Sequence, residues 1–187
     1  SISILKHADA TLESPIMKIT AAVSRTPGQA LSIESLELSS LRDDEILVRV
    51  VATGICHTDL GMRDSPSRVP RPIVLGHEGA GVVVETGKAV AKVKPGDHVV
   101  MSFDTCGACL SCNRGEAAYC LHLGQYNFAG RRLDGSTPLR KGRETVHGHF
   151  FGQSSFSTHA VCHERNTFVV DKDLPLEILG PLGCGFQ

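Results

Sequence analysis

The 187-residue sequence contains no tryptophan, and aromatic residues make up only 5% of it. An excess of charge of one sign is also missing, because 19 lysines and arginines oppose 20 aspartates and glutamates, leaving a net charge of −1. Without a basic field there is little to attract a polyphosphate chain, so nucleic acid is not an expected partner. No apolar run approaches the roughly 20 residues that a membrane-spanning helix needs, so a membrane is not expected either.

The first 16 residues lack the basic start and the long apolar stretch of a secretory leader, which favours a cytoplasmic protein. Seven cysteines form an odd set, and without an export signal a disulfide framework is not expected. Four of the seven lie between residues 106 and 120. In a reducing compartment such a cluster favours a bound metal.

Short stretches with partial alternation of apolar and polar residues, separated by turn residues, predict strands over 17–23, 31–38 and 45–53. Residues 121–155 are polar and glycine-rich and predict a long loop, whereas Pro175 is a suitable start for a helix. The sequence therefore predicts a mostly β (α+β), barrel-like domain with few helices. We expect an N-terminal extension over residues 1–16 and one domain over residues 17–187.

The segment CGACLSCNRGEAAYC places Cys106, Cys109, Cys112 and Cys120 in a C-x2-C-x2-C-x7-C pattern. Four thiolates satisfy a tetrahedral zinc ion in a closed, structural site. The polar residues between them offer no core, so we expect the metal to organise a lobe over residues 104–121. Free or disulfide-paired cysteines are one alternative. An iron–sulfur cluster is another, although its motif closes with x3 and a proline, where this segment has x7 and Leu121.

The segments GICHTDL, VLGHEGAG and LGCGF each hold a histidine or a cysteine that, taken alone, would be assigned to the core or the surface. Together with the VKPGDHV turn and the four-cysteine segment, in this order, they resemble the zinc-dependent medium-chain alcohol dehydrogenases over about residues 17–187. The segments NFAGRRLDGS and FFGQSSFSTHAV look closest to the aryl-alcohol (benzyl-alcohol) branch. The resemblance implies a GroES-like, partly open β-barrel catalytic domain that carries the structural zinc lobe.

By position, the resemblance implies that Cys56, His77 and Cys184 hold a second, catalytic zinc ion, which makes two zinc ions per chain. Two thiolates and one imidazole leave a fourth position open for an alcohol oxygen, as a catalytic zinc site requires. Zinc would lower the pKa of that hydroxyl, and hydride would pass to the nicotinamide of NAD(P). The implied ligands are a small alcohol and its aldehyde.

The resemblance also implies roles for four neighbouring residues. Thr58 matches the hydroxyl that takes the alcohol proton, and Asp59 matches the carboxylate that orients His77. Glu78 occupies the position of a carboxylate behind the zinc, and His57 that of a contact to the cofactor pyrophosphate. Some relatives complete the proton relay with a histidine where this sequence has Gly61, so His57 or water would have to release the proton.

Several other residues have no assigned ligand role. Phe103 fits either the substrate pocket or the core. Cys162 is expected to be a buried small hydrophobe, and His98 is expected to have a structural role. Four histidines are expected to be on the surface or satisfied by partners rather than to bind metal: His147, His149, His159 and His163. A basic stretch is expected to be a solvated loop, with a role near substrate or cofactor as the alternative: Arg131, Arg132, Arg140, Lys141 and Arg143.

A complete G-x-G-x-x-G dinucleotide fingerprint is missing from these 187 residues. The resemblance implies that a nucleotide-binding Rossmann domain follows Gln187, so we expect the chain to be a catalytic-domain fragment that is inactive alone. Homo-oligomerisation is expected in the full-length protein. The alternatives are a glutathione-adduct (S-hydroxymethylglutathione-type) dehydrogenase fragment and a non-catalytic zinc-binding β domain. The zinc-free quinone-reductase branch is disfavoured by Cys56, His77 and Cys184.

Overall fold

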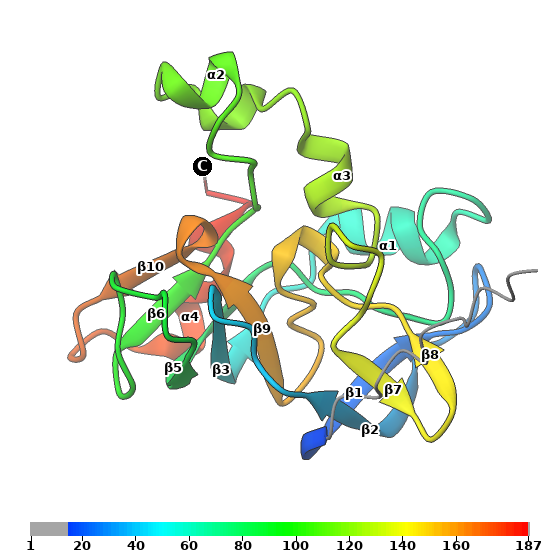
Figure 1. The fold of residues 1–187 in the computed structure, drawn as a ribbon. Helices are drawn as coiled ribbons and strands as arrows, with labels where there is room; N and C mark the ends of the chain where they lie inside the picture. The colour runs from blue at the N-terminus through cyan, green and yellow to red at the C-terminus, as the bar shows by residue number, and fades with distance from the viewer. Residues whose placement is uncertain (1–14, 187) are drawn as a thin grey trace, which may run out of the picture.

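The computed structural model describes residues 15–186, so most of the expected N-terminal extension lies outside the described residues. The described part contains ten strands joined by short helices and turns (Figure 1). The strands are β1 (Pro15–Ser24), β2 (Ser32–Ser39), β3 (Glu45–Thr53), β4 (Ile73–Val74), β5 (Gly79–Thr86), β6 (His98–Met101), β7 (Leu139–Lys141), β8 (Glu144–Val146), β9 (His159–His163) and β10 (Thr167–Val170). The α-helices are α1 (His57–Asp64), α2 (Leu110–Asn113), α3 (Leu123–Asn127) and α4 (Leu176–Leu179). The described residues also form short 3-10 turns of three or four residues: η1 (Ala117–Tyr119), η2 (Phe150–Gly152), η3 (Glu164–Asn166) and η4 (Gly180–Gly183).

The strands form two antiparallel sheets of five strands each, in the orders β4-β1-β2-β7-β8 and β10-β6-β5-β3-β9. The segment before β9 joins the two sheets, because Thr158 donates its backbone N–H to Thr20 and accepts one from Val50. The sheets therefore curve round a shared interior as a half barrel (Figure 1). This confirms the predicted mostly β, partly open barrel.

The interior is built from the alternating apolar residues that predicted the strands. In β2 the pattern buries Leu36 and Leu38 and exposes Ile33, as expected for a strand with one face in the core. The residues packed between the two sheets come from β1, β2, β3, β7, β8 and β9 and include Ile19, Val23, Leu36, Leu38, Leu47, Val146 and Val161. A second cluster, including Met62, Ile73, Leu75 and Phe150, lies beneath α1 and holds that helix against the barrel.

The prediction of one long loop over residues 121–155 is wrong. The segment contains α3, the β7–β8 hairpin and η2, and the hairpin extends the first sheet through pairs such as Leu38 with Leu139. Three-residue strands carry too little periodicity to be recognised, and Glu37 and Glu34 of β2 supply ion-pair partners for Arg140 and Lys141. The stability of the hairpin therefore depends on its neighbour β2 rather than on its own composition.

The predicted helix after Pro175 is present as α4, followed by η4. None of the helices between residues 15 and 186 has the length and apolar character needed to cross a lipid bilayer.

Candidate metal centres

The four clustered cysteines lie at one end of the molecule, where α2 and η1 form a lobe that projects from the second sheet (Figure 1). Their sulfur atoms all lie within 4.8 Å of one another, and none forms a disulfide. The Sγ–Sγ distances are 3.9 Å for Cys106–Cys112, 3.5 Å for Cys109–Cys112 and 3.6 Å for Cys106–Cys120. A tetrahedral zinc ion with Zn–S bonds of about 2.3 Å spaces its sulfurs by about 3.8 Å, so the four thiols are arranged to receive it.

Backbone amides favour the thiolate form of Cys106 and Cys109, whereas burial and the neighbouring Cys109 thiol raise the pKa of Cys112 to about 11. Cys109 donates its backbone N–H to the sulfur of Cys106, and Leu121 donates to the sulfur of Cys109. Backbone hydrogen bonds from Cys112 and Leu121 lower the pKa of the Cys109 thiol to about 6. No residue of α2 or η1 is buried, so the lobe has no apolar interior of its own. This four-cysteine cluster is a structural zinc lobe, and a bound metal takes the place of a core.

A second cluster brings together Cys56, His77, Glu78 and Cys184, with one ligand atom of each within 4.8 Å of the others. Cys56 immediately precedes α1, whereas His77 and Glu78 lie in the connection between β4 and β5. Cys184 follows η4 and reaches the cluster from more than one hundred residues further along the chain. The structure therefore brings the three predicted catalytic-zinc residues to one point.

Asp59 orients the histidine of this cluster. Its Oδ1 lies 3.0 Å from Nδ1 of His77 and accepts the backbone N–H of Gly76, while its Oδ2 accepts the backbone N–H of Cys56. With Asp59 ionised, Nδ1 of His77 carries the proton and Nε2 presents its lone pair to the cluster. Nε2 is buried and has no hydrogen-bond partner. An unpartnered buried nitrogen beside two sulfurs and a carboxylate fits a zinc ligand.

The approach of Cys184 depends on the absence of a side chain at Gly183. A Cβ there would lie 2.0 Å from the carbonyl oxygen of Met101, and the carbonyl of Gly183 accepts the hydroxyl of Ser102 at 2.7 Å. On the other side of Cys184, the backbone N–H of Gly185 donates to Oε1 of Glu78 at 3.2 Å. The glycine-rich ending of the described chain is therefore pressed against β6 and the metal cluster.

The cluster concentrates two thiols and a carboxyl group around a single imidazole. Burial and the neighbouring Cys56 raise the pKa of the Cys184 thiol to about 12. Burial also opposes ionisation of Cys56, but the hydrogen bonds from Thr58 and the proximity of His77 lower the pKa of its thiol below the usual value. A divalent cation would remove this conflict, because it would stabilise both thiolates at once.

The remaining predicted residues lie around this cluster. Thr58 is half-buried in the first turn of α1, His57 beside it is exposed, and Gly61 is on the same helix. The sequence contained no signal for α1 as a helix, and it did not predict two further contacts. Phe151 stacks on the His77 ring with centroids 4.4 Å apart, and the buried amide of Gln153 donates to the carbonyl oxygens of His77 and Ser102. Neither residue belongs to a ligand motif, so spacing could not identify them.

Phe103 borders a cavity of about 150 Å³. Its other aromatic walls are Phe128 and Phe151, whose rings meet edge to face at 5.2 Å. Phe151 also stacks on His77, so this one side chain lies between the cavity and a residue of the cluster of Cys56, His77, Glu78 and Cys184. Cys162 is fully buried as expected for a small hydrophobe, and His98 is half-buried at the start of β6.

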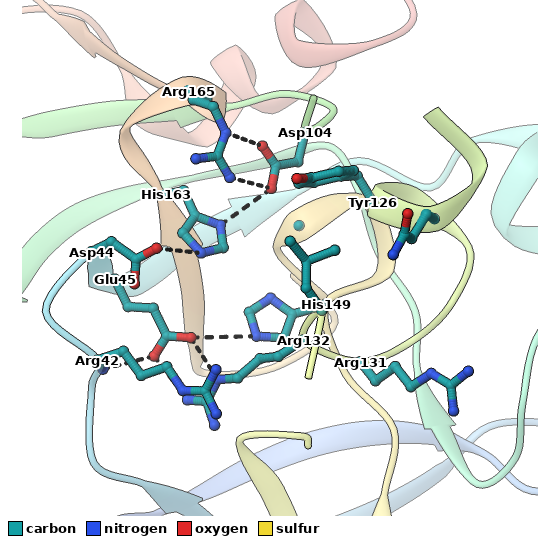
Figure 2. A pocket seen from close by; sticks show the side chains of 13 residues that line it. Arg42, Asp44, Glu45, Asp104, Tyr126, Arg131, Arg132, His149, His163 and Arg165 are labelled. Atoms are coloured by element: carbon teal, nitrogen blue, oxygen red, sulfur yellow. Dashed lines mark hydrogen bonds and ion pairs between the residues drawn. The ribbon is translucent and has the colours of Figure 1, made fainter. Parts of the chain in front are cut away.

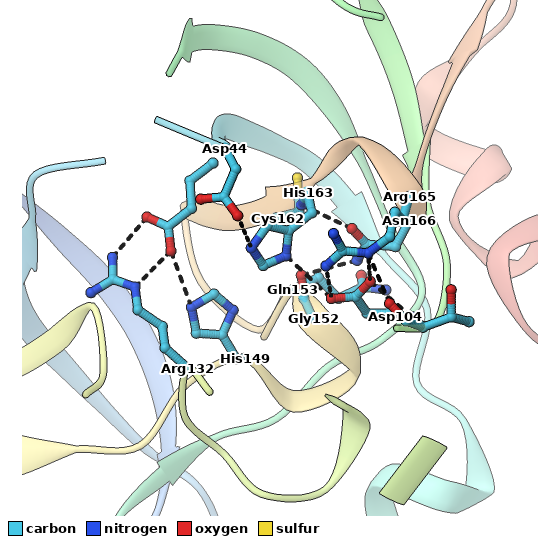
Figure 3. Close-up of polar contacts among 12 residues, drawn as sticks. Asp44, Asp104, Arg132, His149, Gly152, Gln153, Cys162, His163, Arg165 and Asn166 are labelled. Carbon is cyan, nitrogen blue, oxygen red and sulfur yellow. Dashed lines mark hydrogen bonds and ion pairs between the residues drawn. The ribbon is translucent and has the colours of Figure 1, made fainter. Parts of the chain in front are cut away.

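The expectation of a solvated basic loop is wrong for Arg132. This side chain is 5% exposed and pairs with Glu45 through two hydrogen bonds of 2.6 and 2.8 Å (Figure 2). His149 is also buried rather than exposed or satisfied: its Nε2 lies 3.7 Å from Glu45 and lacks a hydrogen-bond partner. Burial lowers the pKa of His149 to about 4, which keeps its imidazole neutral near pH 7. His163 lies between Asp44 and Asp104 at the other end of the same polar network (Figure 3).

Glu45→Gln is expected to lower the free energy of unfolding by about 3–5 kcal/mol, because it leaves the buried guanidinium of Arg132 without its counter-charge. Burial opposes ionisation of Glu45, but the Arg132 hydrogen bonds outweigh it and lower the pKa of the carboxyl below its usual 4.5. The contribution of Glu45 is therefore present above about pH 4.5 and is lost as the pH falls through the lower, folded-state pKa.

Urea unfolding at pH 7 and at pH 3–4 tests this expectation. The matched control is Glu37→Gln, whose pair with Arg140 is partly exposed and is expected to contribute less than about 1 kcal/mol. Equal losses for the two variants at pH 7 would contradict the assigned role of the buried pair.

Comparison with known proteins agrees with this arrangement. The alcohol dehydrogenase GroES-like domain family matches residues 42–172. Geraniol dehydrogenase from Castellaniella defragrans is 50% identical over 168 residues, which are 89% of this chain and 45% of that protein. S-(hydroxymethyl)glutathione dehydrogenase from Escherichia coli is 38% identical over 172 residues, 90% of this chain and 46% of that protein.

Two solved structures resemble the chain closely. An alcohol dehydrogenase zinc-binding domain protein from Burkholderia ambifaria superposes with a TM-score of 0.88 at 52% identity, covering 90% of this chain and 46% of that one. Benzyl alcohol dehydrogenase from Acinetobacter calcoaceticus superposes with a TM-score of 0.86 at 46% identity, covering 91% and 46%. The chain thus spans about half the length of these relatives. It belongs to the zinc-containing medium-chain alcohol dehydrogenases and comprises their GroES-like domain.

Proposed function

We propose that this chain is the catalytic-domain portion of an enzyme that oxidises a primary, aryl-type alcohol to its aldehyde with NAD(P). The observation that carries the proposal is the convergence of Cys56, His77 and Cys184 around the unpartnered Nε2 of His77. These residues would hold one zinc ion, and the four cysteines of the lobe would hold the other. Bound zinc polarises the alcohol hydroxyl and lowers its pKa, and the nicotinamide accepts hydride.

The chain's own residues bind and orient the reacting groups. Asp59 holds Nδ1 of His77 and so fixes the ring that presents Nε2. The hydroxyl of Thr58, which directly precedes Asp59 in the first turn of α1, takes the alcohol proton. Because Gly61 offers no side chain, the proton passes to solvent through water or through the exposed imidazole of His57. When the cofactor is bound, His57 would also contact its pyrophosphate. Glu78 is the fourth member of the metal cluster and would assist exchange of ligands at the bound ion.

The aromatic cavity supports an aryl substrate. Phe103, Phe128 and Phe151 line it, and flat rings pack well against such walls in edge-to-face or offset geometry. The relatives named for benzyl alcohol and geraniol act on primary alcohols with unsaturated carbon frameworks, which is consistent with this choice. The 38% identical glutathione-adduct dehydrogenase supports the second candidate, S-hydroxymethylglutathione.

The decisive experiment expresses the complete reading frame that contains this chain. We expect turnover of benzyl alcohol and geraniol with NAD or NADP, and at most slow turnover of S-hydroxymethylglutathione. The 187 residues alone are expected to be inactive, since they contain no complete dinucleotide fingerprint to hold a nicotinamide against the alcohol. Two bound zinc ions without turnover of any alcohol by the complete protein would favour the non-catalytic zinc domain instead.

Phe103→Ala is expected to lower kcat/KM for benzyl alcohol by about fivefold in the complete protein and to leave ethanol turnover nearly unchanged, because it removes one aromatic contact. The matched control is Phe168→Ala in β10, which is exposed and lies outside the cavity. Equal losses for both alcohols would indicate a packing role for Phe103 and not a contact with the aryl ring.

A further inference from the structure

A basic hollow of about 560 Å³ lies at the far end of α1 from Cys56. The loop that follows α1 forms one wall, and the segment after Phe128 forms another. Among the described residues its lining includes Arg68, Arg71 and Arg131 but no aspartate or glutamate. Three guanidinium groups therefore share one concave surface without an acidic residue in its walls.

Most arginines outside the hollow are paired with carboxylates. Six of the nine form ion pairs with acidic side chains: Arg25, Arg42, Arg63, Arg132, Arg140 and Arg165. Between residues 15 and 186, none of the three arginines of the basic hollow takes part in an ion pair. The other three described arginines without an ion pair are exposed and do not line the hollow: Arg49, Arg114 and Arg143. The hollow is therefore distinguished by bringing three such guanidinium groups to one concave surface.

Arg71 is held rigidly without a counter-charge. Its Nη2 donates to the carbonyl oxygens of Met62 and Arg63 at 2.7 and 2.8 Å, which are at the end of α1. Its Nε is buried and has no hydrogen-bond partner among the residues that the structure describes. Burial alone lowers the pKa of Arg71, with no carboxylate to offset it. Carbonyl dipoles orient this guanidinium but neutralise only part of its charge.

Arg131 is placed opposite this loop by a close contact. A Cβ at Gly130 would lie 2.8 Å from Cγ of Pro70, so glycine lets the segment approach the loop that carries Arg68 and Arg71. Figure 2 shows the Arg131 guanidinium turned away from the Arg132–Glu45 pair. Burial and the charge of Arg131 lower the pKa of His147, so an imidazole that tends to stay neutral lies near Arg131. Arg131 also borders the polar pocket that contains Glu45, but among the described residues it forms no ion pair there.

We propose that the basic hollow binds an oxyanion, the carboxylate or phosphate group of an organic or inorganic ligand. Guanidinium groups present paired N–H donors that match both anions, and here they face a hollow that lacks acidic walls. Phe128 lines the aromatic cavity, and the next residue, Ala129, lines the basic hollow. The oxyanion is therefore either a free phosphate or the acidic end of a molecule whose other part enters the aromatic cavity.

The first test is a titration of the zinc-loaded, ¹⁵N-labelled chain with inorganic phosphate at low ionic strength, followed by amide chemical shifts. We expect the shifts to move over residues 66–71 and 129–131. The double variant Arg68→Gln/Arg131→Gln is expected to bind phosphate at least about tenfold more weakly, because it removes two guanidinium donors. The matched control is Arg49→Gln/Arg143→Gln, which removes the same charge from two exposed arginines outside the hollow.

The second probe is 4-(hydroxymethyl)benzoate, compared with benzyl alcohol in the same titration. If 4-(hydroxymethyl)benzoate binds more tightly than benzyl alcohol, and this advantage is lost in the Arg68→Gln/Arg131→Gln variant, the oxyanion belongs to the substrate. Only this second probe rests on the proposed function. Binding of phosphate alone would assign it to a free anion. The proposal is overturned if neither probe binds more tightly to the parent chain than to the double variant, or if the shifts lie outside the two segments.

Discussion

Cys109→Ser is expected to remove one of the two zinc ions and to unfold the lobe over residues 106–120. The lobe has no buried residue in α2 or η1, so nothing else replaces the metal as its core. Zinc binding at structural sites of this kind contributes about 10–16 kcal/mol to folding, far more than the few surface contacts here. Metal analysis should fall from two zinc ions per chain to one, and limited proteolysis should cut within the lobe.

The matched control is Cys162→Ser, the same substitution at a buried cysteine outside both clusters. It is expected to keep both zinc ions, whatever it costs in stability. The barrel should also remain folded in Cys109→Ser, because the strand pairs of both sheets lie outside the lobe. Retention of two zinc ions in Cys109→Ser would contradict the assignment of this cysteine as a ligand.

His77→Ala is expected to lose the other zinc ion and, in the complete protein, to reduce alcohol turnover by at least about a thousandfold, because electrostatic stabilisation at the reacting oxygen disappears. Nε2 of His77 is the only nitrogen among the four ligand atoms of its cluster, and the other three are acidic groups. Asp59→Asn should have a smaller effect, about 10–100-fold in zinc affinity, since Asp59 only orients the ring. Competition with a chelator measures both effects.

His98→Ala serves as the control, because His98 lies in β6 and outside both metal clusters. It should retain two zinc ions and normal turnover. Cys184→Ser tests the ligand that arrives from the far end of the chain, and it should also release the second zinc ion. A zinc count of two in either His77→Ala or Cys184→Ser would refute the proposed ligand set.

The sequence predicted those parts of the structure that depend on contacts between residues close together in the chain. The four lobe cysteines lie within 15 residues, so their spacing alone limits how they can meet, and the strands of β1–β3 follow from their apolar periodicity. The sequence does not predict the β7–β8 hairpin or the helix α1, because the hairpin strands have three residues each and α1 buries only Asp59 and Met62. In both, contacts with distant segments outweigh the local signal.

The basic stretch that contains Arg131 and Arg132 also shows that sequence alone does not predict whether a side chain is buried. Arg131 and Arg132 are adjacent and chemically identical, yet one is exposed and the other is buried against Glu45, 87 residues away. Sequence can identify the charge of both but not its environment. The difference arises because Glu45 is placed to meet the buried guanidinium of Arg132 and offsets the cost of removing its charge from water.

The sequence predicted the mostly β architecture, the two candidate ligand sets and the resemblance to zinc alcohol dehydrogenases. The three-dimensional arrangement was needed to show that Cys184 lies beside Cys56 and His77, that Asp59 holds Nδ1 of His77, and that three arginines without ion pairs share one hollow. These contacts join segments far apart in the chain. The distances at the metal cluster depend on how α1, the β4–β5 connection and the segment after η4 pack together, and no local pattern of residues encodes that packing.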